Sequence, residues 1–177
     1  FDGVRDYREW DCDKGVYVFK SSGHKYLNTS NDLCTAARIT QWIDEDPAAP
    51  FLVVYRTGMT HYPYYPGETP QTFVKDRDLN NYLNGIRVTD AAVGDIMTYL
   101  ESSDLAESTL VVVVGDHGEA FGEHGTFGHA AGLNEENIHV PLMFINRQLF
   151  DGGVADQIVG VSDIAPTVTD LLGIAPG

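Results

Sequence analysis

Hydrophobic residues recur at helical spacing in two long segments. Between Asp32 and Asp44 the spacing of three and four predicts an amphipathic helix with Asp32 as its N-cap. The motif DEDPAAP follows and ends this helix, because proline cannot continue it. The same spacing between Asp78 and Glu101 predicts a second, longer helix, in which Asp90 is the one polar residue among the core-facing positions.

Short apolar runs predict the strands. VYVFK (16–20) is a short strand candidate, and FLVVY (51–55), STLVVVVGD (108–116) and HVPLMFIN (139–146) are longer ones. Continuous apolar runs are typical of strands buried on both faces, as in a parallel sheet. The last segment, VSDIAPTVTDLLGI, predicts a turn and a short helix with Pro166 in its first turn. This order predicts an α/β protein with a mainly parallel sheet, without internal repeats or an interdomain linker.

Composition narrows the possible partners. The chain has 177 residues, is 43% hydrophobic and carries a net charge of −15. Such a charge argues against nucleic-acid binding and against docking on an anionic membrane surface, and solubility is the simpler interpretation. No apolar run is long enough to span a bilayer. The sequence begins without Met and shows no signal peptide, so we expect a piece of a longer protein.

The strongest chemical signal is the loop GDHGEAFGEHGTFGH after the Val111–Val114 run. Asp116 and His117 stand at the strand's carboxyl end, where α/β proteins gather functional groups. A carboxylate oxygen and an imidazole nitrogen are both good ligands for Zn²⁺ or Mn²⁺. The glycine density excludes a helical zinc motif. We interpret the loop as a metal site rather than as a solvated acidic loop.

Two further loops carry histidines. His61 lies in TGMTHYPYYP, a few residues beyond the FLVVY run, where it can contact a substrate oxyanion or carry a proton. A loop histidine packed on tyrosines is an equally good interpretation from position alone. Glu135, Glu136 and His139 precede the last strand instead of following it, so we expect them on a surface helical turn.

Four of these stretches, in this order, closely resemble the sulfatase family of the alkaline-phosphatase superfamily. FLVVYRTGMTHYPYYP resembles the family's strand and histidine-proline loop, and YLNGIRVTDAAVGDIMTYLE, with Tyr82 and Asp90, resembles its long helix. VVVVGDHGEAFGEHG resembles its second metal motif. HVPLMFIN and VSDIAPTVTDLLGI resemble its closing strand and helix, so the match covers about residues 50–175.

The resemblance implies a mostly parallel central sheet flanked by helices, alkaline-phosphatase-like and incomplete at its amino-terminal half. It implies that Asp116 and His117 are metal ligands, that His61 contacts substrate, and that the cofactor is a divalent metal (Zn, Mn or Ca). His129 matches a histidine of the phosphoethanolamine-transferase branch, where many sulfatases place a lysine. His124 becomes a loop residue or a support for the site.

The nucleophile of the family has no match here. Neither Cys12 in WDCDKG nor Cys34 in DLCTAA has the proline and arginine of a C-x-P-x-R stretch, and no upstream acidic ligand is evident. The resemblance therefore implies that residues 1–177 are the carboxyl-terminal part of a single sulfatase-like domain, whose partner is the amino-terminal half of the same protein. The isolated chain is expected to be inactive.

The implied activity is metal-dependent hydrolysis of sulfate esters, on a small-molecule or lipid-linked substrate. Phosphoester hydrolysis, or phosphoethanolamine or phosphoglycerol transfer, is the first alternative, and a non-catalytic binding or regulatory relative is the second. A structural zinc site of His117, His124 and His129 is a third. A thiol count alone leaves Cys12 and Cys34 open between free thiols and a disulfide. The resemblance implies an extracytoplasmic, membrane-tethered protein, which favours the disulfide.

Overall fold

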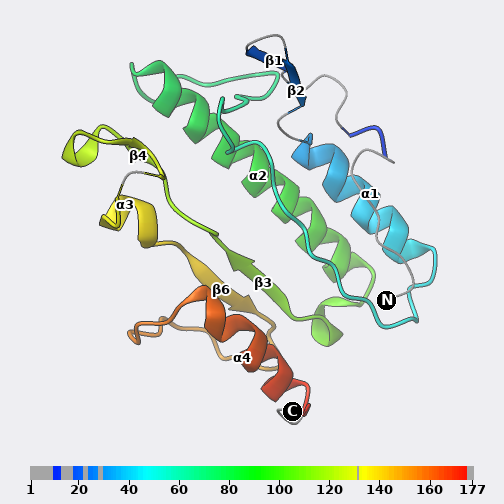
Figure 1. Ribbon diagram of the computed structural model, residues 1–177. Coiled ribbons are helices and arrows are strands. Elements are labelled where there is room, and N and C mark those ends of the chain that lie inside the picture. Colours follow the sequence, from blue (N-terminus) through cyan, green and yellow to red (C-terminus); the bar gives the residue numbers. More distant parts are fainter. Residues whose placement is uncertain (1–9, 13–17, 22–23, 28–29, 131, 175–177) are drawn as a thin grey trace. The chain divides into compact units, whose positions relative to one another are not determined.

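The computed structural model describes residues 10–12, 18–21, 24–27, 30–130 and 132–174 (Figure 1). The chain divides into two compact units, Phe1–Leu105 and Ala106–Gly177. Each unit is described by itself.

The first unit holds a hairpin and the two predicted helices. Strands β1 (Val18–Ser21) and β2 (His24–Leu27) pair antiparallel. The predicted strand at 16–20 is confirmed where it overlaps β1, and its first two residues lie outside the described residues. Helix α1 (Asp32–Asp44) has the predicted bounds, and α2 (Arg77–Ser102) extends the prediction by one residue at each end. No helix in the described part of the chain combines the length and apolarity that crossing a membrane requires.

The N-cap of α1 is Asn31, not Asp32 as the sequence predicted. The Asn31 side chain accepts a hydrogen bond of 3.1 Å from the Cys34 amide. Asp32 instead turns inward and is fully buried. The two residues are both good caps, and the tertiary contacts of Asp32 decide between them.

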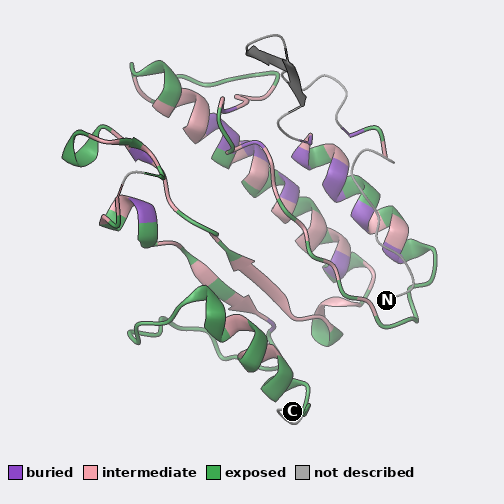
Figure 2. Ribbon diagram, in the orientation of Figure 1, coloured by how far each residue is buried: buried purple, intermediate pink, exposed green. Residues whose placement is uncertain are grey.

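Helices α1 and α2 pack against each other and form the core of the first unit (Figure 2). Small and branched side chains of the two helices are almost completely buried: Ala36, Ile39, Ile43, Val88 and Ala92. Gly85 is also buried. A Cβ at this position would lie 2.6 Å from the carbonyl oxygen of Met59, so only glycine fits there. Small residues therefore let the backbones approach closely at this side of α2.

The predicted core-facing stripe of α2 is not the side that is most buried. Asp90 is exposed, and Ile86 on the same stripe is 41% exposed, whereas Leu100 is buried. Asp90 lies two residues from both Val88 and Ala92, roughly 200° around the helix from them. Hydrophobic periodicity located the larger apolar side chains, but packing selected the face with the smaller ones.

A side chain of α2 holds the connection between α1 and α2 by hydrogen bonds to its backbone. Asn84, fully buried on α2, accepts from the Gln71 amide at 2.7 Å and donates to the Gln71 carbonyl at 2.8 Å.

The FLVVY run (51–55), at the start of the connection between α1 and α2, is not a strand, contrary to the prediction, and Leu52 and Val54 are exposed. A strand needs a neighbour for its backbone groups, and no described strand pairs with this segment.

The second unit contains short strands, helical turns and one helix. In chain order these are η1 (Ala106–Ser108), β3 (Val111–Val114), β4 (Ala120–Phe121), η2 (Glu123–Gly125), β5 (Phe127–Gly128), α3 (Glu135–Ile138), β6 (Leu142–Ile145), η3 (Val161–Asp163) and α4 (Ile164–Leu171). Strand β3 pairs with β6, and β4 with β5. The strands at 108–116 and 139–146, and the final turn and helix with Pro166, are thus confirmed.

The fold class is α/β, as predicted. The three pairings among the described residues are nevertheless antiparallel, where the apolar runs had indicated parallel neighbours. Strand β3 has β6 as its neighbour, and three of its valines are partly buried while Val114 is exposed. Valines on both faces of a strand are typical of a sheet that is buried on both faces. The valines of β3 are less buried than this pattern predicts.

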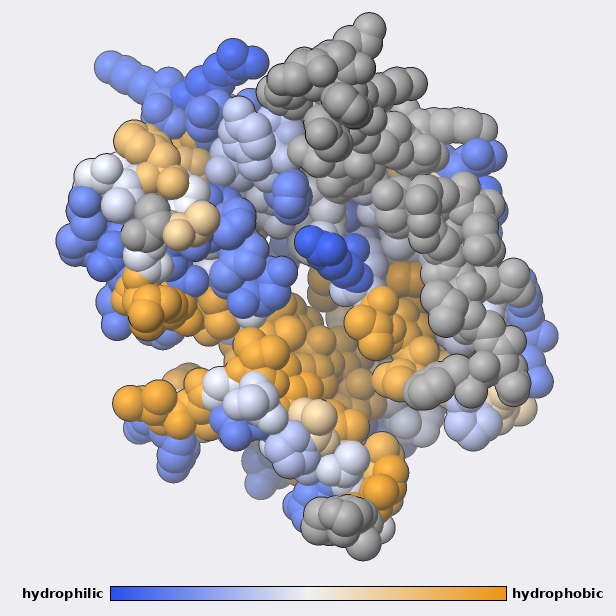
Figure 3. All heavy atoms as spheres, viewed as in Figure 1, coloured by the Kyte–Doolittle hydropathy of each residue, from blue (hydrophilic) through white to orange (hydrophobic). Residues whose placement is uncertain are grey.

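Apolar side chains remain exposed along the last part of the second unit. Figure 3 shows apolar surface over the region of β6 and α4. Ile158 is fully exposed and Val154 is 92% exposed, and several residues nearby are exposed as well: Val159, Val161, Leu172 and Ile174. Contiguous apolar surface of this kind marks a site of further packing.

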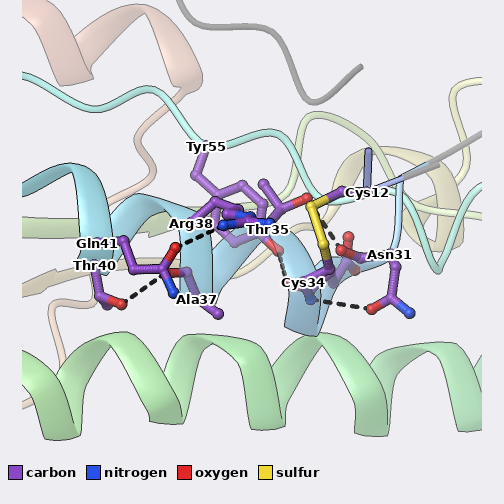
Figure 4. Close-up of a disulfide and its surroundings, with 10 residues drawn as sticks. Cys12, Asn31, Cys34, Thr35, Ala37, Arg38, Thr40, Gln41 and Tyr55 are labelled. Atoms are coloured by element: carbon purple, nitrogen blue, oxygen red, sulfur yellow. Dashed lines mark hydrogen bonds between the residues drawn. A yellow bond between two sulfur atoms is a disulfide. The ribbon is translucent and has the colours of Figure 1, made fainter. Parts of the chain in front are cut away.

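Cys12 and Cys34 form a disulfide, which resolves the alternative that the thiol count left open (Figure 4). Cys12 is fully buried, and its carbonyl accepts a 2.7 Å hydrogen bond from the Asn31 amide. The bridge therefore holds Cys12 against the first turn of α1.

Removing this disulfide is expected to destabilise the first unit by about 3 kcal/mol, because the bridge closes a loop over a sequence separation of 22. Urea unfolding of the full-length protein, with and without reductant and in the Cys12→Ser/Cys34→Ser variant, measures the effect. Reductant should leave the variant unchanged. Two free thiols in the unreduced wild-type protein would contradict the bridge.

Candidate functional site

The loop that leaves β3 carries Asp116 and His117 and is held against the approach to β6. The Gly115 amide donates to the Pro141 carbonyl at 3.1 Å, and the Gly118 amide donates to the Asn137 carbonyl at 2.8 Å. A Cβ at Gly118 would lie 2.0 Å from a backbone oxygen of α3, so glycine is required there. The backbone on both sides of Asp116 and His117 is therefore fixed.

Asp116 and His117 form an adjacent carboxylate–imidazole pair. The His117 Nε2 lies 3.9 Å from the Asp116 Oδ1, and the side chains are 44% and 74% exposed. The His117 Nδ1 lies 2.8 Å from the Gly118 carbonyl oxygen. A carbonyl only accepts, so Nδ1 carries the proton and Nε2 keeps its lone pair. Metal-binding histidines are oriented in this way by the acceptor on their other nitrogen.

This donor set fits part of a divalent metal site. The described residues contain no group of three or more His, Cys, Asp or Glu side chains arranged to hold an ion. A four-coordinate ion bound by Asp116 and His117 would therefore need its other ligands from outside the described residues. Asp116 and His117 are thus two candidate ligands, and their assignment to a metal stays a prediction.

His129 follows β5 directly and lies beside His117. The two rings stack with centroids 4.0 Å apart and planes 28° apart. The Nδ1 of His129 lies 3.3 Å and 3.4 Å from the two carboxylate oxygens of Glu119. The structure thus brings together three of the residues that the sequence singled out, namely Asp116, His117 and His129. Glu119 was not singled out, although it is the last residue of the DHGE motif.

His124 points to a different partner. Its Nδ1 lies 2.9 Å from the Glu136 Oε1, and that hydrogen bond raises the pKa of His124 above 6.5 and lowers the pKa of Glu136 below 4.5. The alternative of a structural zinc site of His117, His124 and His129 is not supported, because these histidines form no such ligand group in the described part of the chain. His139 and Glu135 lie exposed at α3, as predicted for a surface turn.

His61 belongs to the first unit and lies on an exposed turn. Its amide donates to the Gly58 carbonyl at 3.1 Å, and its carbonyl accepts from the Tyr64 amide at 2.8 Å. The His61 Nδ1 lies 2.8 Å from the Tyr62 carbonyl oxygen, so Nε2 is again the nitrogen with the free lone pair. His61 is therefore held on a defined, exposed turn.

Asp32 anchors the segment that precedes His61, a role that the sequence did not indicate. Its carboxylate accepts from the amides of Gly58 at 2.8 Å and Met59 at 3.2 Å, and from the Thr89 hydroxyl at 2.7 Å. Burial raises the pKa of Asp32 above 3.8, while the bonds from Thr89, Gly58 and Met59 lower it by less. No pattern along the chain signals this contact, because its partners come from two distant segments.

Comparison with known proteins gives a consistent family. A family model described as Sulfatase matches residues 5–174. Arylsulfatase K of Mus musculus is 36% identical over 87 residues, which are 49% of this chain and 16% of that protein. The low-salt glycan biosynthesis sulfotransferase Agl7 of Haloferax volcanii is 30% identical over 140 residues, which are 72% of this chain and 35% of that protein. The chain thus spans well under half the length of these relatives.

A solved structure shows the same fold. The Bacteroides fragilis protein yidJ, described as a candidate sulfatase, superposes with a TM-score of 0.71 at 21% identity. The match covers 86% of this chain and 39% of that one.

Proposed function

This chain belongs to the sulfatase family, and we propose that the full-length protein hydrolyses sulfate esters, with this chain supplying part of the metal and substrate site. The observation that carries the proposal is the Asp116–His117 pair, whose ligand atoms lie 3.9 Å apart on a fixed loop at the carboxyl end of β3. The family match and the arylsulfatase K relatives favour sulfate over other esters.

Asp116 and His117 would hold a divalent metal (Zn, Mn or Ca) through one carboxylate oxygen and the His117 Nε2. Such an ion polarises an ester oxygen and supplies positive charge near the substrate. The chain has a net charge of −15, so an anionic ester needs such local compensation. The Nδ1–H of His117 remains on the Gly118 carbonyl and keeps the ring oriented.

His61 and His129 are proposed to contact the substrate. Each has its Nδ1 beside an acceptor, which leaves Nε2 to face the ester or the leaving group, and Nε2 donates to an oxygen there only when the ring is doubly protonated. Protonated, an imidazole of this kind donates to a developing negative charge. The nucleophile and the remaining acidic ligand are proposed to come from the amino-terminal half of the same protein.

A phosphate ester is the second candidate substrate. His129 supports it, because this position resembles the histidine of phosphoethanolamine transferases rather than the lysine of many sulfatases. A non-catalytic relative is the third candidate. The sequence of the amino-terminal half distinguishes this candidate from an enzyme. If that half lacks both the acidic ligand and a Thr, Ser or C-x-P-x-R nucleophile, the enzymatic proposal fails.

Residues 1–177 are proposed to be the carboxyl-terminal part of one sulfatase-like domain. The relatives are longer than the matched segment, and the exposed apolar residues around Val154 and Ile158 offer surface for the rest of the domain to cover. The disulfide between Cys12 and Cys34 favours an oxidising, extracytoplasmic compartment, with any membrane tether outside this chain.

Turnover by the full-length protein tests the proposal. We expect hydrolysis of 4-nitrophenyl sulfate in the presence of Zn²⁺, Mn²⁺ or Ca²⁺, supplied in turn, and loss of hydrolysis with a chelator. 4-Nitrophenyl phosphate and bis(4-nitrophenyl) phosphate serve as competing substrates. Faster turnover of a phosphate ester would select the second candidate, and no turnover of any of the three would count against an ester hydrolase.

A further inference from the structure

We propose that Glu119 is a positioning residue that orients the His129 ring for its contact with substrate. This inference rests on the proposed function, in which His129 contacts the ester. It adds a residue that neither the motif nor the family match assigns to a role.

The hairpin of β4 and β5 places the two residues opposite each other. Its register pairs Ala120 with Gly128, so the next residues outward are Glu119 and His129, opposite each other at the open end of the hairpin. Gly128 has a φ of +80°, a conformation that favours glycine, and a Cβ there would contact the Glu119 Oε1 at 3.5 Å. The backbone conformation at Gly128 thus places the next residue, His129, beside the Glu119 carboxylate.

The Glu119 side chain is the least exposed of the three glutamates that pair with a histidine among the described residues. Its side chain is 7% exposed, whereas the side chains of Glu136 and Glu135 are 15% and 82% exposed. Both Glu119 oxygens lie within 3.4 Å of the His129 Nδ1. A carboxylate only accepts, so Nδ1 carries a proton, and in the neutral ring the lone pair is on Nε2. A buried acceptor holds that tautomer more strongly than an exposed one.

Helix α3 locks the backbone next to both residues. Asn137 accepts from the Gly118 amide through its carbonyl at 2.8 Å, and its side-chain amide donates to the Gly128 carbonyl at 3.0 Å. Gly118 precedes Glu119 and Gly128 precedes His129. One buried asparagine therefore sets the spacing of the pair.

The His117 ring supports His129 on its other side. The stacked rings, 4.0 Å apart, prevent the His129 ring from tilting toward His117, while Glu119 holds its Nδ1 edge. With tilt and rotation both restricted, the Nε2 atom is the one presented for bonding. Rigid support of this kind is what a substrate-contacting group requires for efficient turnover.

Glu119→Ala in the full-length protein tests the inference. We expect kcat for 4-nitrophenyl sulfate to fall about 10–100-fold with KM changed less than about threefold, since the ring remains but is no longer oriented. Glu119→Gln keeps an acceptor oxygen and should restore most of kcat. Glu119→Asp retracts the carboxylate by one methylene, should give an intermediate kcat, and serves if the alanine variant does not fold.

The matched control is Glu135→Ala, which removes the partner of His139 from an exposed pair and should leave kcat unchanged. ¹⁵N-histidine NMR at alkaline pH gives a readout independent of turnover: the wild-type and Glu119→Gln proteins should show His129 protonated on Nδ1, and Glu119→Ala a mixture. Wild-type kcat in Glu119→Ala, or a wild-type His129 protonated on Nε2, would overturn the inference. If the wild-type protein hydrolyses no ester, the proposed function fails and the NMR comparison alone decides the role of Glu119.

Discussion

Replacing His117 with alanine is expected to abolish metal binding at the β3 loop and to lower kcat/KM by more than about 100-fold. Residues that merely orient a metal ligand cost about 10–100-fold when removed, and His117 is proposed as a ligand itself. Without it, only Asp116 remains of the pair, a single carboxylate that is 74% exposed. Turnover of 4-nitrophenyl sulfate and calorimetric titration with Zn²⁺, Mn²⁺ and Ca²⁺ measure the two effects.

His139→Ala is the matched control for this experiment. It also removes an exposed imidazole of the second unit, but one whose partner is Glu135 on a surface turn. Its metal affinity and kcat/KM should equal those of the wild-type protein. A His117→Ala protein with wild-type metal affinity would show that the ligand assignment is wrong, whatever its activity.

Replacing Asp32 with alanine is expected to destabilise the first unit by about 3 kcal/mol or more. The substitution leaves the amides of Gly58 and Met59 and the hydroxyl of Thr89 without their acceptor, and each stranded donor costs about 1–3 kcal/mol. Urea unfolding of the full-length protein measures the loss. Glu45→Ala, which removes an exposed carboxylate at the C-cap of the same helix, is the control and should change stability far less. An Asp32→Ala protein as stable as this control would contradict the anchoring role.

The pH dependence of this effect has a definite sign. The folded protein holds the Asp32 proton more tightly than the unfolded chain, because burial raises the pKa of Asp32 above 3.8. The stability that Asp32 contributes is therefore largest below 3.8 and is lost as the pH rises through the folded-state pKa. Asp32→Asn cannot titrate at this position. The free energy of unfolding of the wild type minus that of this variant should therefore decrease as the pH rises from 3.8 through the folded-state pKa of Asp32. An increase of this free-energy difference with rising pH would contradict a raised pKa of Asp32.

The helices and the candidate ligands could be predicted from the sequence because both depend on local order. Helical periodicity extends over neighbouring turns, so α1 and α2 were located within one residue at each end. Asp116 and His117 are adjacent in the chain, and a strand that ends in such a pair delivers both to one loop whatever surrounds it. The α/β class followed from the order of these elements.

Contacts between distant segments were decided by the tertiary structure alone. Asn31 caps α1 since Asp32 is drawn inward by donors more than 25 positions away. The FLVVY run is not a strand since no described strand takes up its backbone groups, and the most buried face of α2 is the one whose small residues permit close packing. The pairing of Cys12 with Cys34 and of Glu119 with His129 likewise depends on where the chain turns. Periodicity records which side chains avoid water, whereas partners are chosen by distance and shape, and these exist only once the chain has folded.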